Sequence, residues 1–190
     1  MIPSLYPRFR EWSARGSVYL MGDTHFGDTE LQAGIPTRPS DEELVARINK
    51  RVGRNDTFVL LGDCTTTDAA LAYLAQLHGY KVLIAGNHDQ NIERLIPYFN
   101  EIYTGPIMIG EKILLSHEPI DVPWAINFHG HRHQKCYEPA HMVNCCADII
   151  GYTPISLGQY IKEHGLGAAT SIHRITIDKA TERKKKRGNS

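Results

Sequence analysis

The sequence lacks net charge, long apolar runs and a signal peptide, which are features of nucleic-acid-binding, membrane and secreted proteins. Its 21 basic and 21 acidic side chains cancel, so it lacks the net positive field that many nucleic-acid-binding proteins carry. No apolar run is long enough to span a membrane. The first 16 residues hold Arg8, Arg10 and Arg15 in place of the apolar core of a signal peptide. We therefore expect a cytoplasmic protein with no membrane partner. Nucleic acid is not favoured as a partner, although neutrality alone does not exclude it.

Cysteine is also scarce. No Cys-x-x-Cys pair occurs among Cys64, Cys136, Cys145 and Cys146, so a thiolate zinc site is not expected. In a reducing compartment these residues are predicted to be free thiols. No pattern pairs any of them with a base, which argues against a cysteine nucleophile.

The sequence does contain apolar runs that end in polar side chains. Val82-Leu83-Ile84-Ala85 runs into Gly86-Asn87-His88-Asp89. A short apolar run halted by Gly is typical of a buried strand that ends in a loop. The same design recurs at residues 18–25, 58–63 and 113–117. A sheet that gathers these strand ends would form a metal site.

The order of elements predicts an α/β fold. Strands are predicted at 17–22, 57–61 and 81–85, and helices at 41–52, 69–78 and 91–96. This alternation predicts parallel strands joined by crossover helices. Ser40 and Glu43 form a capping box before the first helix. Residues 1–16 are predicted to be an irregular lead-in, and the long loop 23–39 is predicted to be functional.

The second half of the chain is predicted to be richer in strands. Strand candidates lie at 101–104, 106–109, 112–116, 124–128, 141–145 and 171–178. Ser156 is predicted to cap a helix that ends at His164. We expect a single domain over residues 1–178 and a basic, disordered tail over residues 179–190, because a run of five like charges at 183–187 is typical of a solvated segment.

Seven side chains at the strand ends and in the loops that follow are candidate metal ligands: Asp23, His25, Asp63, Asn87, His117, His131 and His133. Oxygen and imidazole donors suit divalent ions, and two close ions need a bridging carboxylate to offset their repulsion. The gaps of 40 residues from Asp23 to Asp63 and of 24 from Asp63 to Asn87 each fit one strand–helix–strand step. Each motif alone is weak, but the ordered set favours a metal site.

The sequence resembles the calcineurin-like metallophosphoesterases, in particular small single-domain bacterial and phage members, in five motifs: Asp23-Thr24-His25, Gly62-Asp63, Gly86-Asn87-His88-Asp89, Ser116-His117 and Gly130-His131-Arg132-His133. The resemblance implies a four-layer α/β/β/α sandwich, in which two mixed sheets flanked by helices hold two metal ions at the strand ends. It implies that one ion is held by Asp23, His25, Asp63 and His133. The other would be held by Asp63, Asn87, His117 and His131, with Asp63 as the bridge.

The resemblance also implies catalytic roles. His88 would protonate the leaving oxygen or stabilise the transition state, and Asp89 would orient His88. A water that bridges two ions becomes hydroxide near neutral pH and can attack phosphorus, while an imidazole can give a proton to the leaving group. Arg38 and Arg132 are candidates for binding a phosphate oxygen, and Asn87 is a further candidate for binding the substrate. A surface role is equally open for each arginine.

Two subfamilies fit poorly. Protein Ser/Thr phosphatases carry an arginine soon after the Gly-Asp motif, where this chain has Cys64-Thr65-Thr66-Thr67-Asp68. Double-strand-break nucleases add a DNA-binding cap, for which this chain has no room. We therefore predict a metal-dependent phosphoesterase that hydrolyses a phosphate mono- or diester, favouring a small phosphodiester or nucleotide.

The predicted cofactor is a pair of divalent ions, with Mn²⁺ favoured and Fe, Zn, Ni or Mg as alternatives. A small nuclease that acts on DNA or RNA is the first alternative function. A catalytically silent binding scaffold of the same fold is an alternative of another class. The sequence leaves the oligomeric state open.

Overall fold

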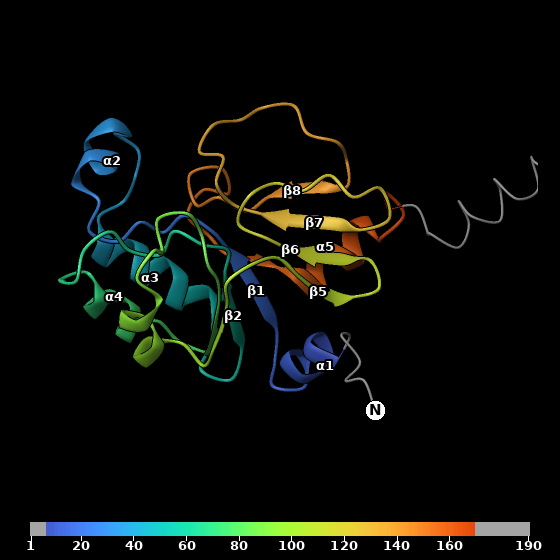
Figure 1. Cartoon of the computed structure of the whole chain (residues 1–190), viewed down its shortest axis with the longest axis horizontal. Coiled ribbons are helices and arrows are strands. Elements are labelled where there is room, and N and C mark those ends of the chain that lie inside the picture. Colours follow the sequence, from blue (N-terminus) through green and yellow to red (C-terminus); the bar gives the residue numbers. More distant parts are fainter. Residues whose placement is uncertain (1–6, 170–190) are drawn as a thin grey trace, which may run out of the picture.

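The computed structural model describes residues 7–169, and its strands form two sheets that face each other (Figure 1). The first sheet has the order β4-β3-β2-β1-β9 and the second has the order β5-β6-β7-β8. The strands are β1 (Val18–Met21), β2 (Thr57–Leu60), β3 (Tyr80–Ile84), β4 (Glu101–Tyr103), β5 (Ile107–Gly110), β6 (Ile113–Leu115), β7 (Ile126–His129), β8 (Met142–Asn144) and β9 (Ile155–Ser156).

The helices flank these sheets. They are α1 (Pro7–Ser13), α2 (Thr29–Gly34), α3 (Asp41–Arg51), α4 (Leu71–Gln76) and α5 (Leu157–His164), with the 3₁₀ turns η1 (Ile92–Arg94) and η2 (Ile96–Tyr98). In Figure 1, β1 and β2 lie between α3 and α4 on the left and the second sheet on the right. Side chains of α1 and α5 pack against the apolar layer between the two sheets.

Strand β2 shows why the central strands read as continuous apolar runs. Phe58 and Leu60 pack toward α3 and α4, whereas Val59 and Leu61 pack toward the second sheet. All four side chains are fully buried. A strand covered on both faces needs apolar residues at every position, as in parallel sheets covered by other layers.

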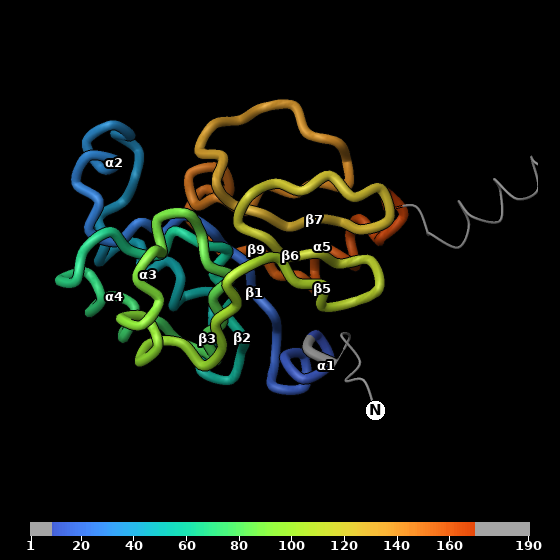
Figure 2. Tube along the Cα trace, viewed as in Figure 1, coloured from blue at the N-terminus to red at the C-terminus, as the bar shows by residue number. Residues whose placement is uncertain are grey.

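The pairing makes both sheets mixed, as predicted. Strands β1 to β4 are parallel to their neighbours, and β9 adds an antiparallel edge beside β1 (Figure 2). In the second sheet β6, β7 and β8 are parallel and β5 is antiparallel. The carboxyl ends of β1, β2 and β3 therefore meet at one edge of the first sheet.

The predicted N-terminal caps at Ser40 and Ser156 are confirmed. The Ser40 side chain accepts a hydrogen bond from the Glu43 amide, and Ser156 does the same for Gln159. Ser156 also pairs with Tyr19 across the edge of the first sheet. The sequence analysis did not predict β9, because a two-residue strand that runs directly into a helix leaves no alternating pattern to detect.

Several predicted boundaries are wrong. The irregular lead-in contains α1, and the long loop 23–39 contains α2. The second helix starts at Leu71 instead of residue 69, since the Thr67 hydroxyl accepts from the Ala70 amide and holds a turn there. The helix predicted at 91–96 is a pair of 3₁₀ turns, with Pro97 inside the second. The strand predicted at 171–178 and the basic tail lie outside the described residues.

None of the helices within residues 7–169 is long and apolar enough to cross a lipid bilayer.

Trp12 of α1 belongs to the core although it lies in the segment predicted to be irregular. Its side chain is 1% exposed, and its indole nitrogen donates to a Glu101 carboxylate oxygen at 3.1 Å. We expect Trp12→Ala to lower the free energy of unfolding by about 3–5 kcal/mol, because it removes a large buried side chain and leaves a cavity. Urea unfolding measures this change. Tyr137→Ala is the matched control, since Tyr137 is 92% exposed and should change stability by less than about 0.5 kcal/mol.

Candidate metal centre

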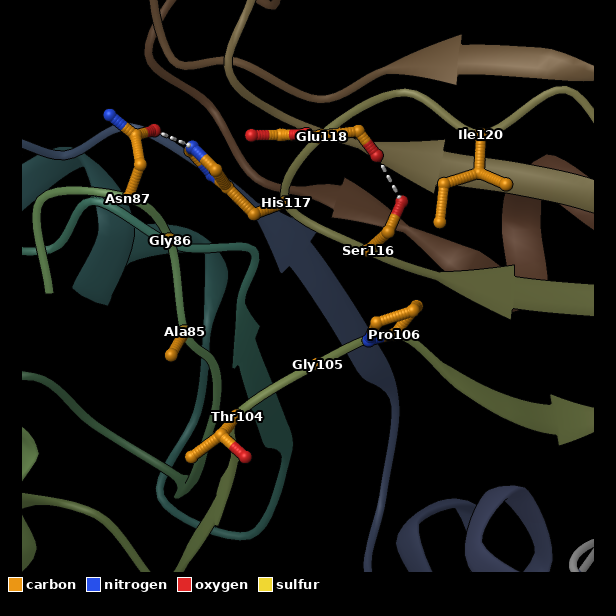
Figure 3. Close-up of a pocket in the computed structure, with 10 residues that line it drawn as sticks. All are labelled: Ala85, Gly86, Asn87, Thr104, Gly105, Pro106, Ser116, His117, Glu118 and Ile120. Carbon is orange, nitrogen blue, oxygen red and sulfur yellow. Dashed lines mark hydrogen bonds between the residues drawn. The ribbon is translucent and has the colours of Figure 1, made fainter.

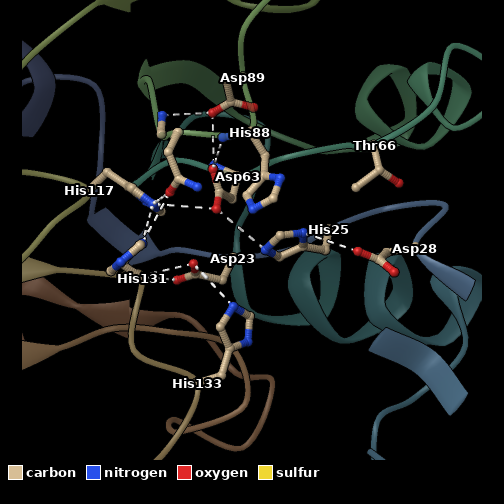
Figure 4. A network of polar contacts seen from close by, with 12 residues as sticks. Asp23, His25, Asp28, Asp63, Thr66, His88, Asp89, His117, His131 and His133 are labelled. Carbon is tan, nitrogen blue, oxygen red and sulfur yellow. Dashed lines mark hydrogen bonds and ion pairs between the residues drawn. The ribbon is translucent and has the colours of Figure 1, made fainter. Parts of the chain in front are cut away.

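The structure brings all seven predicted ligands to one edge of the sandwich, where β1, β2, β3, β6 and β7 end (Figure 4). Each ligand follows the carboxyl end of its strand within four residues. In open α/β sheets this edge is where ligands bind, because the loops that leave the strands converge there.

One group of donors consists of Asp23, His25 and His133, whose ligand atoms all lie within 4.8 Å of one another. His133 Nε2 lies 3.6 Å from Asp23 Oδ1. Asp23 and His25 are buried, and His133 is half-buried. These three donors could hold one cation that reaches them from the open side.

A second group of donors lies next to the first. His117 Nε2 is 2.8 Å from Asn87 Oδ1 and 3.1 Å from His131 Nδ1, and these last two atoms are also 3.1 Å apart. Three potential ligand atoms therefore meet at one point. Together with Asp63 they could hold a second cation.

Asp63 lies between the two groups. Its Oδ2 is 3.5 Å from His25 Nε2 in the first group and 3.4 Å from His117 Nε2 in the second. Its Oδ1 accepts a hydrogen bond from the His88 amide at 2.9 Å, which fixes the plane of the carboxylate. The position suits a carboxylate that contacts both cations.

The backbone at four candidate ligands is in the left-handed region. Asp23, His25, Asp63 and His131 have φ angles of 61°, 42°, 52° and 67°. Such conformations cost non-glycine residues about 1–3 kcal/mol each and persist only where the surroundings hold them. They turn four donor side chains inward from the strand ends.

Two glycines make this crowding sterically feasible. A Cβ atom at Gly62 would lie 2.3 Å from His117 Nδ1, and one at Gly86 would lie 2.3 Å from Asp63 Oδ1. Real Cβ atoms do not approach other atoms so closely. The Gly-Asp and Gly-Asn motifs therefore both need Gly for space, and Gly62, with a φ of 82°, needs it for the backbone conformation as well.

Hydrogen bonds fix the orientation of two of the imidazole rings. His117 Nδ1 donates to the Leu61 carbonyl oxygen at 2.9 Å, and His133 Nδ1 donates to Asp148 Oδ2 at 2.7 Å. In the neutral form of each ring, this bond keeps the proton on Nδ1 and leaves the lone pair of Nε2 directed into the cluster. Partners of this kind fix the tautomer of metal-ligating histidines.

The ionisation of the cluster fits a cation. Burial lowers the pKa of His25 to about 4, so this ring is neutral and its lone pair is free to bind. Burial alone would lower the pKa of His117, but the hydrogen bond and charge of Asp63 outweigh burial and raise it to about 9. Burial raises the pKa of Asp23 to about 6. Without a cation, a proton on His117 offsets part of the carboxylate charge.

The two ring nitrogens of His25 give the clearest test of whether the donors fit a metal ion. Both are buried and have no hydrogen-bond partner among residues 7–169. Their nearest carboxylate oxygens, on Asp28 and Asp63, are 3.6 and 3.5 Å away. Two ligands of one ion in tetrahedral geometry lie roughly 3.3–3.6 Å apart. The spacing between His25 and Asp63 suits a shared cation better than a direct hydrogen bond.

A third cluster, of His133, Cys146 and Asp148, does not suit a metal ion. The Asp148 carboxylate is already paired with the Arg38 guanidinium at 2.7 Å. Burial raises the pKa of the Cys146 thiol far above its ordinary value, which disfavours the thiolate that a metal ion would need. This cluster serves to support His133.

His88 lies over the centre and is exposed. Its ring meets the ring of His25 edge-on, with the centroids 5.4 Å apart (Figure 4). The His88 backbone amide donates to Asp63, which positions the residue on the side of the donors, while the ring is exposed to solvent. This arrangement lets His88 reach a group bound at the donors.

The predicted role of Asp89 is wrong. The Asp89 carboxylate does not orient His88, because its two oxygens accept from the backbone amides of Asp63, Gly86 and Cys64 at 2.8, 2.9 and 3.1 Å. The Cys64 thiol also contacts Asp89 Oδ1 at 3.1 Å. Asp89 thus ties the loop after β2 to the loop after β3.

Of the two candidate phosphate-binding arginines, Arg38 differs from the prediction, whereas Arg132 stays a candidate. Arg38 is 5% exposed and is directed into the protein, where it pairs with Asp148 and donates to backbone carbonyls. Its buried, fully paired guanidinium is not placed to bind substrate. Arg132 is half-exposed, but its guanidinium pairs with Glu138 at 3.0 Å.

Sequence reasoning missed Asp148, which supports His133 from behind. It follows Cys145-Cys146-Ala147 and precedes Ile149-Ile150. A single carboxylate within an apolar run is costly to bury without partners. That pattern was the available signal for a functional residue.

A hollow of about 270 Å³ opens beside the second donor group (Figure 3). Asn87 and His117 form the end of the hollow nearest the donors, and Pro106 and Ile120 give it apolar walls. The carboxylate of Glu118 is exposed at its rim. The hollow has room for one ring-sized group next to the donors.

The position of Asp63 between the two donor groups yields a test. We expect Asp63→Asn to lose bound metal, because the variant removes the negative charge that lies between the two groups. Metal content after dialysis against Mn²⁺ measures this loss. Asp68→Asn is the matched control, since the Asp68 side chain is 82% exposed and pairs only with Arg94. An Asp63→Asn protein that keeps as much metal as the control would contradict the assignment.

Two solved structures and one family model are similar to this chain. Among solved structures, the protein of unknown function AQ665 from Aquifex aeolicus is 27% identical with a TM-score of 0.66, and the match covers 77% of this chain and 98% of that one. The nuclease MPE from Pseudomonas putida is 25% identical with a TM-score of 0.49, over 64% of each chain. A comparison with curated proteins found no match. A family model described as calcineurin-like phosphoesterase matches residues 16–183, so the chain belongs to the calcineurin-like phosphoesterase family.

Proposed function

We propose that this protein is a hydrolase of phosphoesters that works with two divalent metal ions. The observation that carries the proposal is the position of Asp63, whose Oδ2 is 3.5 Å from one donor group and 3.4 Å from the other. Two adjacent ions that share a carboxylate can clamp the attacking and leaving oxygens of an in-line displacement and supply an activated water. The unpartnered nitrogens of His25 support a cation at this point.

The donor set favours Mn²⁺. It consists of carboxylate and amide oxygens and imidazole nitrogens, with no thiolate, and such mixed sites suit ions of intermediate hardness. Fe, Zn, Ni and Mg are alternatives. We assign one ion to Asp23, His25, Asp63 and His133, and the other to Asp63, Asn87, His117 and His131.

His88 is the residue that we expect to act on the substrate. Its ring is exposed above the donors and does not belong to either donor group. From there it can hold a proton for the leaving oxygen as the ester bond breaks. Asn87, the residue before it, directs its amide oxygen to the donors. Asn87 would therefore bind the metal ion, and His88 would transfer the proton.

We propose a small phosphodiester or nucleotide as substrate. The hollow of about 270 Å³ next to Asn87 and His117 suits a single ring-sized ester group. The exposed carboxylate of Glu118 at its rim places negative charge beside the hollow. A long nucleic acid would have to approach this carboxylate, at a cost that rises as salt falls.

Leaving-group dependence tests His88. We expect His88→Ala to keep its metal and to lose roughly 10²–10⁴-fold in kcat for an alkyl ester, since a general acid is worth about that much. A p-nitrophenyl ester should lose much less, because p-nitrophenolate leaves without a proton. The measurement compares kcat for both esters with Mn²⁺ present, and metal content is determined on the same samples. Equal losses for both esters would contradict the acid role.

Substrate size separates the proposal from its alternatives. We expect deletion of residues 179–190, which hold the basic run, to leave turnover of bis-p-nitrophenyl phosphate within about twofold, because the tail is distant in sequence from the donors. Degradation of long single-stranded DNA or RNA is measured in parallel at low salt. If the intact protein degrades these polymers far faster than the diester and the truncation abolishes this, the nuclease alternative replaces the proposal. Two tightly bound ions without turnover of any ester would favour the silent scaffold.

A further inference from the structure

A buried arginine connects several parts of the metal centre. The Arg38 side chain is 2% exposed, and its Nη1 donates to both oxygens of Asp148 at 2.7 and 2.8 Å. The Asp148 side chain is 4% exposed. A guanidinium buried so completely is held in one orientation by its partners, and it holds them in turn.

The other end of the same guanidinium holds the first ligand loop. Arg38 Nη2 donates to the carbonyl oxygens of Asp23 and Thr24. These carbonyls belong to the segment in which Asp23 and His25 adopt left-handed conformations. Arg38 therefore helps to keep a strained backbone that points two donor side chains inward.

Asp148 in turn fixes the ring of a third donor, His133. Its Oδ2 accepts from His133 Nδ1 at 2.7 Å, and its Oδ1 accepts from the Tyr152 hydroxyl at 2.8 Å. The bond to Nδ1 places the ring proton there and leaves the lone pair on Nε2, which faces Asp23. Asp23, His25 and His133 thus all depend on Arg38 and Asp148.

The second donor group has a different support. His117 Nδ1 donates to the Leu61 carbonyl, and its Nε2 meets Asn87 and His131. The two donor groups share Asp63, and the Asp23 carboxylate also accepts from the His131 amide at 2.9 Å. The described side-chain contacts of His117 and Asn87, however, do not pass through Arg38 or Asp148.

We propose that Arg38 and Asp148 are positioning residues for one ion position only, the one formed by Asp23, His25 and His133, so that this position can be emptied while the other stays filled. The inference rests on the proposed function, because it needs two ion positions. It gives Arg38 a structural role in place of the predicted contact with phosphate.

The test is Asp148→Asn, which removes a charge and keeps the shape. Arg38 and Tyr152 both donate toward this side chain, so the amide oxygen of the variant should face them and its NH₂ group should face His133. An NH₂ group at Nδ1 forces the ring proton to Nε2, the nitrogen that must bind the ion. A wrong tautomer of this kind is the known effect of replacing the Asp of a Ser-His-Asp triad by Asn.

We expect one Mn²⁺ ion to bind roughly 10–100-fold more weakly in Asp148→Asn, the usual effect of losing a partner of a metal-ligating His. The second ion should bind as in the wild type. Calorimetric titration with Mn²⁺ measures both affinities. Electron paramagnetic resonance then distinguishes a coupled Mn²⁺ pair from the isolated ion expected in the variant.

Asp121→Asn is the matched control. Asp121 pairs with His141 at 2.6 Å, so it too is an Asp–His pair, but the Asp121 side chain is 63% exposed and the pair lies outside the centre. It should bind both ions as the wild type does. Arg38→Lys is the second variant of the centre, since a lysine lacks the planar guanidinium whose two nitrogens reach Asp148 on one side and the carbonyls on the other. It should weaken the same single ion.

A measurement on the wild type keeps the inference testable even if a variant fails to fold. In the Zn²⁺-loaded protein, nitrogen NMR of the histidine rings should find the His133 proton on Nδ1, and a proton on Nε2 would overturn the inference. Equal weakening of both ions in folded Asp148→Asn, or of neither, would overturn it too. A wild-type protein that binds no Mn²⁺ and no Zn²⁺ would overturn the proposed function itself, and this inference with it.

Discussion

The structure depends on the cost of gathering carboxylates and imidazoles at one buried point. Asp23 and Asp63 are nearly inaccessible to solvent, and their charges need compensation that the protein alone supplies only in part. Against the effect of burial, the carboxylate of Asp63 raises the pKa of His117 to about 9, so a proton on His117 offsets part of this charge without a cation. A divalent cation would relieve it fully. Much of the surrounding structure serves to hold these donors together against their own repulsion.

Two further carboxylates help to hold the donors in place, Asp89 through backbone amides and Asp148 through its bond to His133 Nδ1. Asp89 accepts from the amides of the loops after β2 and β3, and so fixes the distance between Asp63 and the Gly86 turn. Asp148 works from the opposite side, where Arg38 neutralises it. The two sheets are also tied together here, since Gly22, the residue before the first ligand, bridges to Cys146, two residues before Asp148. Each supporting carboxylate thus lies where two separate chain segments must stay in register.

The fold was largely predictable from local patterns, and the errors have specific causes. Apolar runs located β1, β2 and β3 to within a residue, because strands buried on both faces need apolar residues throughout. Short or irregular elements escaped detection. Trp12 lies in a helix that is held by packing onto the core and that carries no periodic pattern of its own. The turns around Pro97 are 3₁₀ because proline fits such short turns.

The sequence by itself determined which side chains could bind a metal and that they lie at strand ends. Both follow from a local pattern, an apolar run followed by Asp, Asn or His. Only the tertiary structure decided what the neighbouring polar residues do. Asp89 is adjacent to His88 in sequence but bonds to backbone amides of another loop. Arg38 and Asp148 are 110 residues apart, yet they form one buried pair. Adjacency in sequence constrains only the backbone. The partner of a buried charge depends on three-dimensional packing, because packing sets how far the charge is removed from water and so its desolvation cost.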